Sequence, residues 1–552
     1  NSAGKYVDIT TENPVTVGNM YIMKLNHKVD DKIQARSNIE GFLNRKTGMP
    51  QKEIGGKPGE RHNPLRIGEQ EMSALQAHQA VWNVLEATTF KSDGGGDAAQ
   101  RMALFDAIST GKLDGLNYPT TPQTLNVLKD TLTASGLNVK PINSETGKKT
   151  TFDSVYDSIA LAPMKPSNLI KTIGAKNEVT LPYMWNARDK TKKETDEPVS
   201  HGLIDPAIFG NLNDPESRNK WGYIRLATPV PNPILSKERY NPYRALTGMK
   251  STEFNNLMNG KAVMVVDPDE YKGSAFSGMK ARDKKMKIAE IKASMAKAGL
   301  KGGDLISPDK LESLISQCGE ILWKAGGEGL QHQLDKIDVN KELRATKKAL
   351  NSAKSSEVDG LYKKYRTLNM LKENKMEASD LMMQYVPVAP TYLRNPIQQG
   401  KIIINPDVNK LYSQLITTNT PLKESLGNGF DMYTSSNPVE AARATANLYK
   451  KAAGLAGTIT AQDFKTKKEL NGLLQPLAGK KGLIHQQMLG KRVDFSGRSV
   501  IGVEPSLSMD QAIVPYDMAR DLYRPFVIRE LIKSGKAKNQ EEAMKKLDNK
   551  HK

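Results

Sequence analysis

The chain has 552 residues, too many for one ordinary hydrophobic core, and this length predicts roughly three or four domains. Its 80 Lys and Arg outnumber its 61 Asp and Glu, and the net charge of +19 favours a polyanionic partner, nucleic acid first. The single cysteine, Cys318, excludes a disulfide framework and a cysteine-based zinc site within the chain. We see no signal-peptide pattern and no apolar run of membrane-spanning length, so we expect a soluble, intracellular protein.

The first 149 residues predict a mixed helical and extended region. The apolar run at 20–23 predicts a strand, and residues 24–36 alternate in charge as a salt-bridged helix surface would. Met72, Leu75, Trp82 and Leu85 predict one apolar face of a single helix. A helical pair and a short strand follow, and turn-formers and lysines mark a boundary near residue 149.

The middle of the chain is richer in lysine and in helical spacing. Ile288, Ile291 and Met295 form an apolar stripe on a basic helix, and we expect the similar segment 343–375 to pair with it as a hairpin. Two further amphipathic helices follow the proline-spaced residues 386–396. Their equal stripes predict an antiparallel coiled-coil arm, with Val408, Leu411 and Leu415 on one helix and Val439, Ala442, Ala446 and Tyr449 on the other.

Asp267 and Asp269 are the most visible candidates for metal-dependent chemistry. Carboxylates at this spacing, after a short apolar run, can hold Mg²⁺. The same letters, DPDE, are an ordinary turn sequence, which we favour. Two functions therefore stay open at this point: a self-contained metal enzyme that uses these carboxylates, and a basic DNA-binding structural protein.

Residues 490–500, GKRVDFSGRSV, are the most distinctive basic motif. Glycine permits close approach of a backbone to a ligand, and the arginine fork suits phosphate oxygens. Lys480, Lys481 and His485 add a basic approach to this motif. Charge alone indicates a solvated basic loop as readily as a nucleic-acid contact.

Taken in order, these motifs resemble the two large subunits of multisubunit DNA-dependent RNA polymerases. RIGEQEMSALQAHQAVWNVLEATTFKSD, at 66–93, is similar to the C-terminal part of the β subunit, where the family usually reads RFGEME. From about residue 152 the chain is similar to the start of the β′ subunit. The similar segments are FDSVYDSIALAP, GLIDPAIFG, GYIRLATPV, VPVAPTYLRNP and GKRVDFSGRSVIGVEPSLSMDQAIVPYDMARDLYRPFVIREL.

The resemblance implies a multidomain α+β fold. Residues 1–149 would form a clasp module like the C-terminal part of the β subunit, and 150–400 would form a β′ clamp region that includes the lid. Residues 401–452 would be the clamp coiled-coil arm, and 453–479 would take the place of the rudder. Residues 480–552 would hold the hinge called switch 2 and the start of the double-psi β-barrel of the active site.

The resemblance also implies which residues touch nucleic acid. Arg394 would belong to the lid, and a set of cations would hold template DNA and the RNA–DNA hybrid. This set comprises Lys480, Lys481, Lys491, Arg492, Arg498, His27, Lys28, Lys32 and Arg36. No residue of the chain would be catalytic, because the family's metal-binding NADFDGD segment does not occur in it. Mg²⁺ would be ligated by a partner chain, and no zinc is expected because no cysteine lies between about 165 and 222.

The implied function is that of one subunit in a split polymerase, whose assembled form transfers nucleotidyl groups to RNA. The implied partners are chains with the β N-terminal and β′ C-terminal parts, a promoter-specificity factor, template DNA and nascent RNA, but no membrane. A β tail joined to a β′ head without the zinc cluster is similar to the polymerases of giant bacteriophages, which implies the cytoplasm of an infected bacterium or the virion. A bacterial β–β′ fusion, or a fragment of one, stays open.

Overall fold

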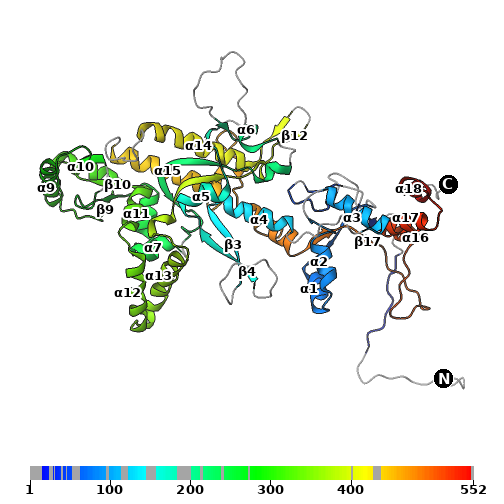
Figure 1. Cartoon of the computed structure of the whole chain (residues 1–552). Helices are drawn as coiled ribbons and strands as arrows, with labels where there is room; N and C mark the ends of the chain where they lie inside the picture. Colours follow the sequence, from blue (N-terminus) through cyan, green and yellow to red (C-terminus); the bar gives the residue numbers. More distant parts are fainter. Residues whose placement is uncertain are drawn as a thin grey trace, which may run out of the picture.

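The computed structural model describes residues 15–23, 29, 32–38, 42–44, 46–52, 62–94, 98–112, 122–143, 157–182, 201–211, 215–237, 241–271, 274–399, 402–426 and 437–548. Helices and short strands alternate through these ranges, which confirms the mixed α+β class. The described parts form two lobes (Figure 1). We call the described residues of 32–38, 62–112 and 490–548 the terminal lobe and the described residues of 122–489 the central lobe. None of the described helices combines the length and the apolar character needed to cross a membrane.

The terminal lobe brings the first and last parts of the chain together. Its strands pair antiparallel across more than four hundred residues of sequence, β1 (Gln34–Arg36) with β17 (Ser496–Arg498) and β2 (Leu65–Ile67) with β16 (Lys491–Val493). Phe105 and Ile528 share a small buried core that joins α3 to α17. The helices of this lobe are α1 (Glu69–Ala77), α2 (Val81–Thr88), α3 (Ala98–Thr110), α16 (Tyr516–Leu522), α17 (Arg524–Lys533) and α18 (Gln540–Asp548).

The central lobe holds the largest hydrophobic core, built around the antiparallel pair β7 (Gly222–Pro231) and β11 (Met382–Val388). Its helices are α4 (Gln123–Ala134), α5 (Pro166–Ile173), α6 (Pro206–Phe209), α7 (Pro242–Thr247), α8 (Ser251–Met258), α9 (Ala281–Lys297), α10 (Pro308–Cys318), α11 (Gly326–Leu334), α12 (Val339–Asn351), α13 (Ser355–Glu373), α14 (Asp407–Leu426) and α15 (Pro438–Ala456). Its other strands are β3 (Leu137–Asn143), β4 (Asp157–Pro163), β5 (Val179–Leu181), β6 (His201–Gly202), β8 (Val263–Val265), β9 (Leu305–Ile306), β10 (Trp323–Ala325), β12 (Ile397–Gln399), β13 (Ile402–Ile404), β14 (Ala461–Gln462) and β15 (Glu469–Leu470).

The helices of the central lobe fulfil the periodicity predictions in part. Ile291 and Met295 of α9 are buried, as the stripe predicts. The expected hairpin between α9 and 343–375 is wrong, because that segment falls within α12 and α13, which pack against each other. Helices α14 and α15 form and pack side by side, as expected. Their buried stripes also face β7 and β10, so the pair is embedded in the core of the lobe.

The N-terminal region departs from its predictions at two places. Residues 20–23 form no strand, and their side chains are exposed. The prediction of a single helical face at 72–85 is wrong. The left-handed backbone of Gln79 (φ +58°) separates α1 from α2, and Trp82 is exposed. The strand after Gly136 forms as predicted. It pairs as β3 with β4 across residue 149, so the two sides of the expected boundary share one hairpin.

Gly327 tests how closely α11 packs on β7. A Cβ atom at this position would lie 1.8 Å from the carbonyl oxygen of Pro229, so Gly327→Ala must push α11 away from the strand. We expect a loss of at least about 2 kcal/mol and faster hydrogen exchange in α11 and β7. Gly360→Ala in α13 is the matched control, because nothing lies within 4 Å of its Cβ position. It should stabilise α13 by about 0.5–1 kcal/mol, and equal effects of the two changes would contradict the packing.

Candidate nucleic-acid interface

Asp494 is the centre of the basic motif, in the turn between β16 and β17. Its carboxylate is fully buried and accepts hydrogen bonds from Nε of Arg36 and Nε of Arg101, each at 2.8 Å. Its backbone N–H donates to the carbonyl oxygen of Lys91 at 2.6 Å. Burial raises the pKa of Asp494, while Arg101 and Arg36 oppose the shift. The carboxylate of Asp494 thus joins β1 and α3 to the motif, and its backbone N–H joins the turn after α2.

Lys491 makes a second buried ion pair, with Asp93. Its Nζ lies 2.7 Å from Oδ1 of Asp93, and the other carboxylate oxygen accepts the backbone N–H of Thr124, in α4, at 2.8 Å. Burial lowers the pKa of Lys491, and the charge of Asp93 opposes this shift. The ammonium of Lys491 therefore connects the terminal lobe to α4 and does not reach the surface.

Arg492 is half-buried beside another arginine. Its NH1 donates to the carbonyl oxygen of Pro64 at 3.1 Å, and NH2 of Arg66 donates to the carbonyl oxygen of His485 at 2.9 Å. Burial, and then the nearby charge of Arg66, lower the pKa of Arg492. The two arginines are opposite each other in the middle of the β2–β16 pair, and they bind the residue before β2 and a residue upstream of β16.

Four of the predicted cations face solvent in the described structure. Lys480 and Lys481 lie in the turn before a single π-helical turn, Ile484–Met488. Such turns are rare and frequently mark functional sites. Arg498 ends β17 opposite Gln34, and Lys32 precedes β1. These side chains can meet phosphate oxygens without breaking a buried contact.

The other predicted cations lie elsewhere. Arg36 is buried against Asp494, and His27 and Lys28 fall outside the described residues. The guanidinium of Arg394 is also buried: Nε donates to Ala389 and NH1 to Leu203, each at 2.6 Å. Burial lowers the pKa of Arg394 to about 10. Arg394 therefore fixes the base of the β12–β13 hairpin from inside the central lobe.

Arg101 and Asp93 are important residues that the sequence reasoning missed. Arg101 lies in the otherwise largely apolar AAQRMALF stretch of α3, and a lone arginine in such a stretch indicates a buried partner. Asp93 carries no comparable signal, because its partner Lys491 is 398 residues away.

Asp267 and Asp269 form a turn. The N–H of Asp269 donates to Oδ1 of Asp267 at 3.0 Å, and the carboxylate of Asp269 pairs with Lys292. Within the ranges that the structure describes, no group of three or more His, Cys, Asp or Glu residues is placed to hold a metal ion.

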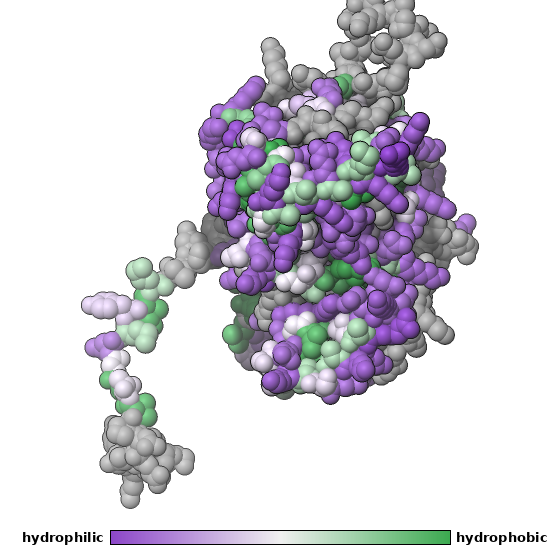
Figure 2. All heavy atoms as spheres, turned by 90° about the vertical axis from the view of Figure 1, so that its left-hand side faces the viewer, coloured by the Kyte–Doolittle hydropathy of each residue, from purple (hydrophilic) through white to green (hydrophobic). Residues whose placement is uncertain are grey.

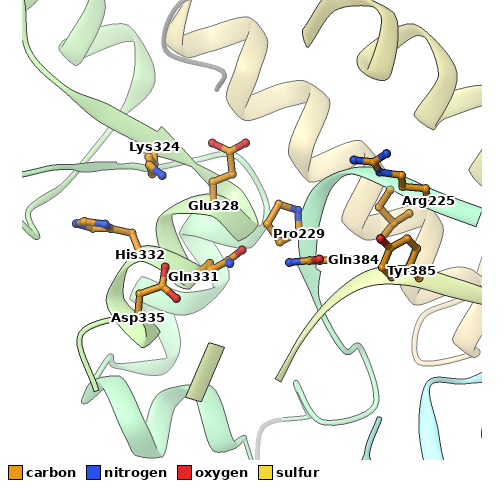
Figure 3. A pocket seen from close by; sticks show the side chains of 10 residues that line it. Arg225, Pro229, Lys324, Glu328, Gln331, His332, Asp335, Gln384 and Tyr385 are labelled. Carbon is orange, nitrogen blue, oxygen red and sulfur yellow. The ribbon is translucent and has the colours of Figure 1, made fainter. Parts of the chain in front are cut away.

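A separate polar cavity of about 250 Å³ lies in the central lobe between α11, β7 and β11 (Figure 3). Its lining includes Arg225, Lys324, Glu328 and His332. His332 is 9% exposed, and its burial, followed by the charges of Lys336 and Lys324, lowers its pKa to about 4. The imidazole is therefore neutral near pH 7.

Comparison with known proteins identifies the class of protein. The family described as RNA polymerase Rpb1, domain 1 matches residues 174–488, and RNA polymerase Rpb1, domain 2 matches residues 490–549. The matched segments place the chain among the large subunits of multisubunit RNA polymerases. Because the first match alone covers more than half of the residues, the chain belongs to the Rpb1 family.

Individual relatives agree with this family. The chain is 26% identical over 419 residues to the DNA-directed RNA polymerase subunit beta' of Mycoplasmoides gallisepticum, covering 63% of this chain and 32% of the relative. It is 28% identical over 340 residues to the same subunit of Lactobacillus delbrueckii subsp. bulgaricus, covering 60% and 25%. The beta' subunit of Staphylococcus aureus is 26% identical over 333 residues, again covering 60% and 25%. The chain thus spans about a quarter to a third of these relatives' length.

Asp494→Asn tests whether the buried carboxylate holds the terminal lobe together. The amide keeps the shape but leaves Arg36 and Arg101 buried without a counter-charge, which costs about 3–5 kcal/mol in comparable cases. We expect faster hydrogen exchange in β1, β16, β17 and α3. Asp283→Asn, at an exposed position of α9, is the control and should change stability by less than about 0.5 kcal/mol. Equal effects would contradict the role of Asp494.

His332 predicts a pH dependence in the central lobe. Its pKa is 6.5 when unperturbed and about 4 in the folded chain, so the unfolded chain takes up this proton first on acidification. The contribution of His332 to stability should therefore be lost as the pH falls through the window between these two values. His332→Gln should lose less stability than the parent chain in this window, measured by hydrogen exchange in α11. An unchanged acid response would contradict the assignment, and His78→Gln, at the exposed end of α1, is the control.

Proposed function

We propose that this chain is a subunit of a DNA-dependent RNA polymerase and that its exposed cations hold template DNA and the RNA–DNA hybrid. The observation that supports this proposal is that some cations of the motif and its surroundings are exposed, whereas others are held in buried ion pairs. Lys480, Lys481, Arg498 and Lys32 face solvent, while buried ion pairs fix the strands between them. Exposed cations on a rigid backbone are suited to contact phosphates, because the backbone that carries them needs little further ordering on binding.

The buried cations have a different proposed role. Lys491, Arg36 and Arg492 position the motif from within, and Arg394 positions the lid hairpin β12–β13. His27 and Lys28 precede Lys32 in the sequence, and we include them in the nucleic-acid surface on the resemblance alone. Substitutions of the residues that position the motif should destabilise the fold, and they should weaken nucleic-acid binding only as a consequence of that destabilisation.

The assembled enzyme is proposed to be split over several chains. Residues 150–400 would form the clamp, and its arm, which holds the α14–α15 pair, would meet a promoter-specificity factor. Other chains would supply the β N-terminal and β′ C-terminal parts, including the aspartates that bind Mg²⁺ for nucleotidyl transfer. The absence of cysteine at 165–222 supports a giant-bacteriophage type, which would act in the cytoplasm of the infected host or be carried in the virion.

The salt dependence of template binding tests the nucleic-acid surface. In the assembled polymerase, Arg498→Ala should weaken binding and lower the slope of log K against log salt by about one unit. The double change Lys480→Ala and Lys481→Ala should lower it by about two units on the same basis. Lys285→Ala, at an exposed position of α9, is the matched control and should leave the slope unchanged.

The opposite result is informative. Slopes equal to the parent in both the Arg498 and the Lys480/Lys481 variants would remove the proposed contacts. Tight binding of duplex DNA by this chain alone, with no transcription after reconstitution, would favour the basic DNA-binding structural protein instead.

A further inference from the structure

An apolar groove opens in the terminal lobe beside the turn at Asp494 and Phe495, which joins β16 to β17. Its volume is about 470 Å³, and its lining includes Phe90, Leu104, Ile108, Phe495, Tyr523 and Phe526. The walls come from the end of α2, from α3, from the turn at Phe495 and from the junction of α16 and α17. Segments distant in sequence thus build one hydrophobic site.

Phe495 contributes its ring from a strained backbone. Its φ is +53°, in the left-handed region that a bulky residue rarely adopts. The neighbouring residues enforce this conformation, because Asp494 is tied to Arg36 and Arg101, and Ser496 Oγ donates to Val493 O at 2.8 Å. Backbone strain of this kind concentrates at binding and catalytic sites. A strained aromatic residue that lines an apolar groove indicates a binding function.

The rim of the groove is hydrophobic and open to solvent. Tyr523 is 58% exposed and Phe526 46% exposed, and their rings meet edge to face with centroids 6.2 Å apart. By contrast, the face that carries α9 and α10 is mostly hydrophilic, with scattered apolar patches (Figure 2). Exposed apolar surface of this extent marks an interaction site.

The chemistry of the lining argues for a protein occupant. The charged lining residues are Lys91 and Glu86, which pair with each other at 2.7 Å, so the groove offers little to a phosphate backbone. Apolar pockets with aromatic rims bind large apolar side chains, which act as anchors of protein interfaces. Under the proposed function this chain is one of several polymerase polypeptides, because its matched domains belong to a large subunit of multisubunit RNA polymerases.

From these observations we infer that the groove at Phe90, Phe495, Tyr523 and Phe526 is a docking site for an apolar segment of another polymerase polypeptide, anchored by an aromatic or leucine side chain. This inference rests on the proposed function for the identity of the partner. Four of the groove's lining residues, including Phe495 and Phe526, lie within the segment that matches Rpb1 domain 2, while the opposite wall precedes the first matched residue. The partner would therefore contact both ends of the chain at once.

Site-specific crosslinking tests the occupant. Phe526 is replaced by the photo-crosslinker p-benzoylphenylalanine, the polymerase is assembled with its co-purifying chains, and the crosslinked peptides are identified by mass spectrometry. We expect a peptide with an apolar anchor from a stoichiometric polymerase chain. The same crosslinker at Met286, an exposed apolar residue of α9, should not give this product. A crosslink to a second copy of this chain or to nucleic acid, or no crosslink, would overturn the inference.

A substitution pair separates this inference from the proposed function. Tyr523→Ser with Phe526→Ser should reduce co-purification of the crosslinked chain at least tenfold, while Met286→Ser should not. Because both aromatic side chains are about half exposed, the lobe should keep its hydrogen-exchange pattern. Undiminished co-purification of that chain would sink the docking site even if the salt slopes behave as proposed. Conversely, the Tyr523/Phe526 variant could lose co-purification while the Arg498 and Lys480/Lys481 variants keep the parent salt slope. That combination would remove only the nucleic-acid assignment.

Discussion

The buried carboxylate of Asp494 between two guanidinium groups is the interaction on which the terminal lobe depends. The hydrophobic clusters of this lobe are small, and its paired strands are three residues long. Burying three charges costs several kcal/mol per ion unless each is matched by hydrogen bonds. Arg36 and Arg101 supply these bonds from separate segments, and the carbonyl oxygen of Lys91 accepts the backbone N–H of Asp494 from a third, so the lobe closes only when all of them are in place. Polar geometry, more than apolar area, therefore specifies this part of the fold.

This constraint divides the basic residues into two classes. If a cation that neutralises a buried carboxylate moved to a phosphate, the carboxylate would stay in the interior as an unpaired charge, which is energetically costly. Lys491 and Arg36 are thus held in the fold, whereas Arg498 and Lys480 keep their charge in solvent. The net charge of +19 can attract a polyanion over a distance, but only the second class is free to touch it.

In the central lobe, local patterns in the sequence predicted local structure well. The stripe of α9, the helices α14 and α15 and the strand after Gly136 follow from spacing and turn chemistry, which neighbouring residues determine. The sequence patterns did not predict which helices pack together. Helix α13 packs on α12 and not on α9, because tertiary contacts select among equally amphipathic faces. The sequence identifies the basic motif, but it does not distinguish the buried cations of the motif from the exposed ones. Arg36 and Asp494 are 458 residues apart, and charge spacing carries no information on such a pairing.

The turn at Asp494 and Phe495 links the two proposed surfaces physically. The carboxylate fixes the turn, the strained backbone directs the ring of Phe495 into the groove, and β17 then carries Arg498 to the solvent three residues later. A partner that packs on Phe495 would favour the strained conformation and offset part of its cost. It would thereby hold β17 in its register with β1. Assembly of the polymerase and ordering of the template-facing cations would then be thermodynamically coupled through a single residue, and the coupling must be reciprocal.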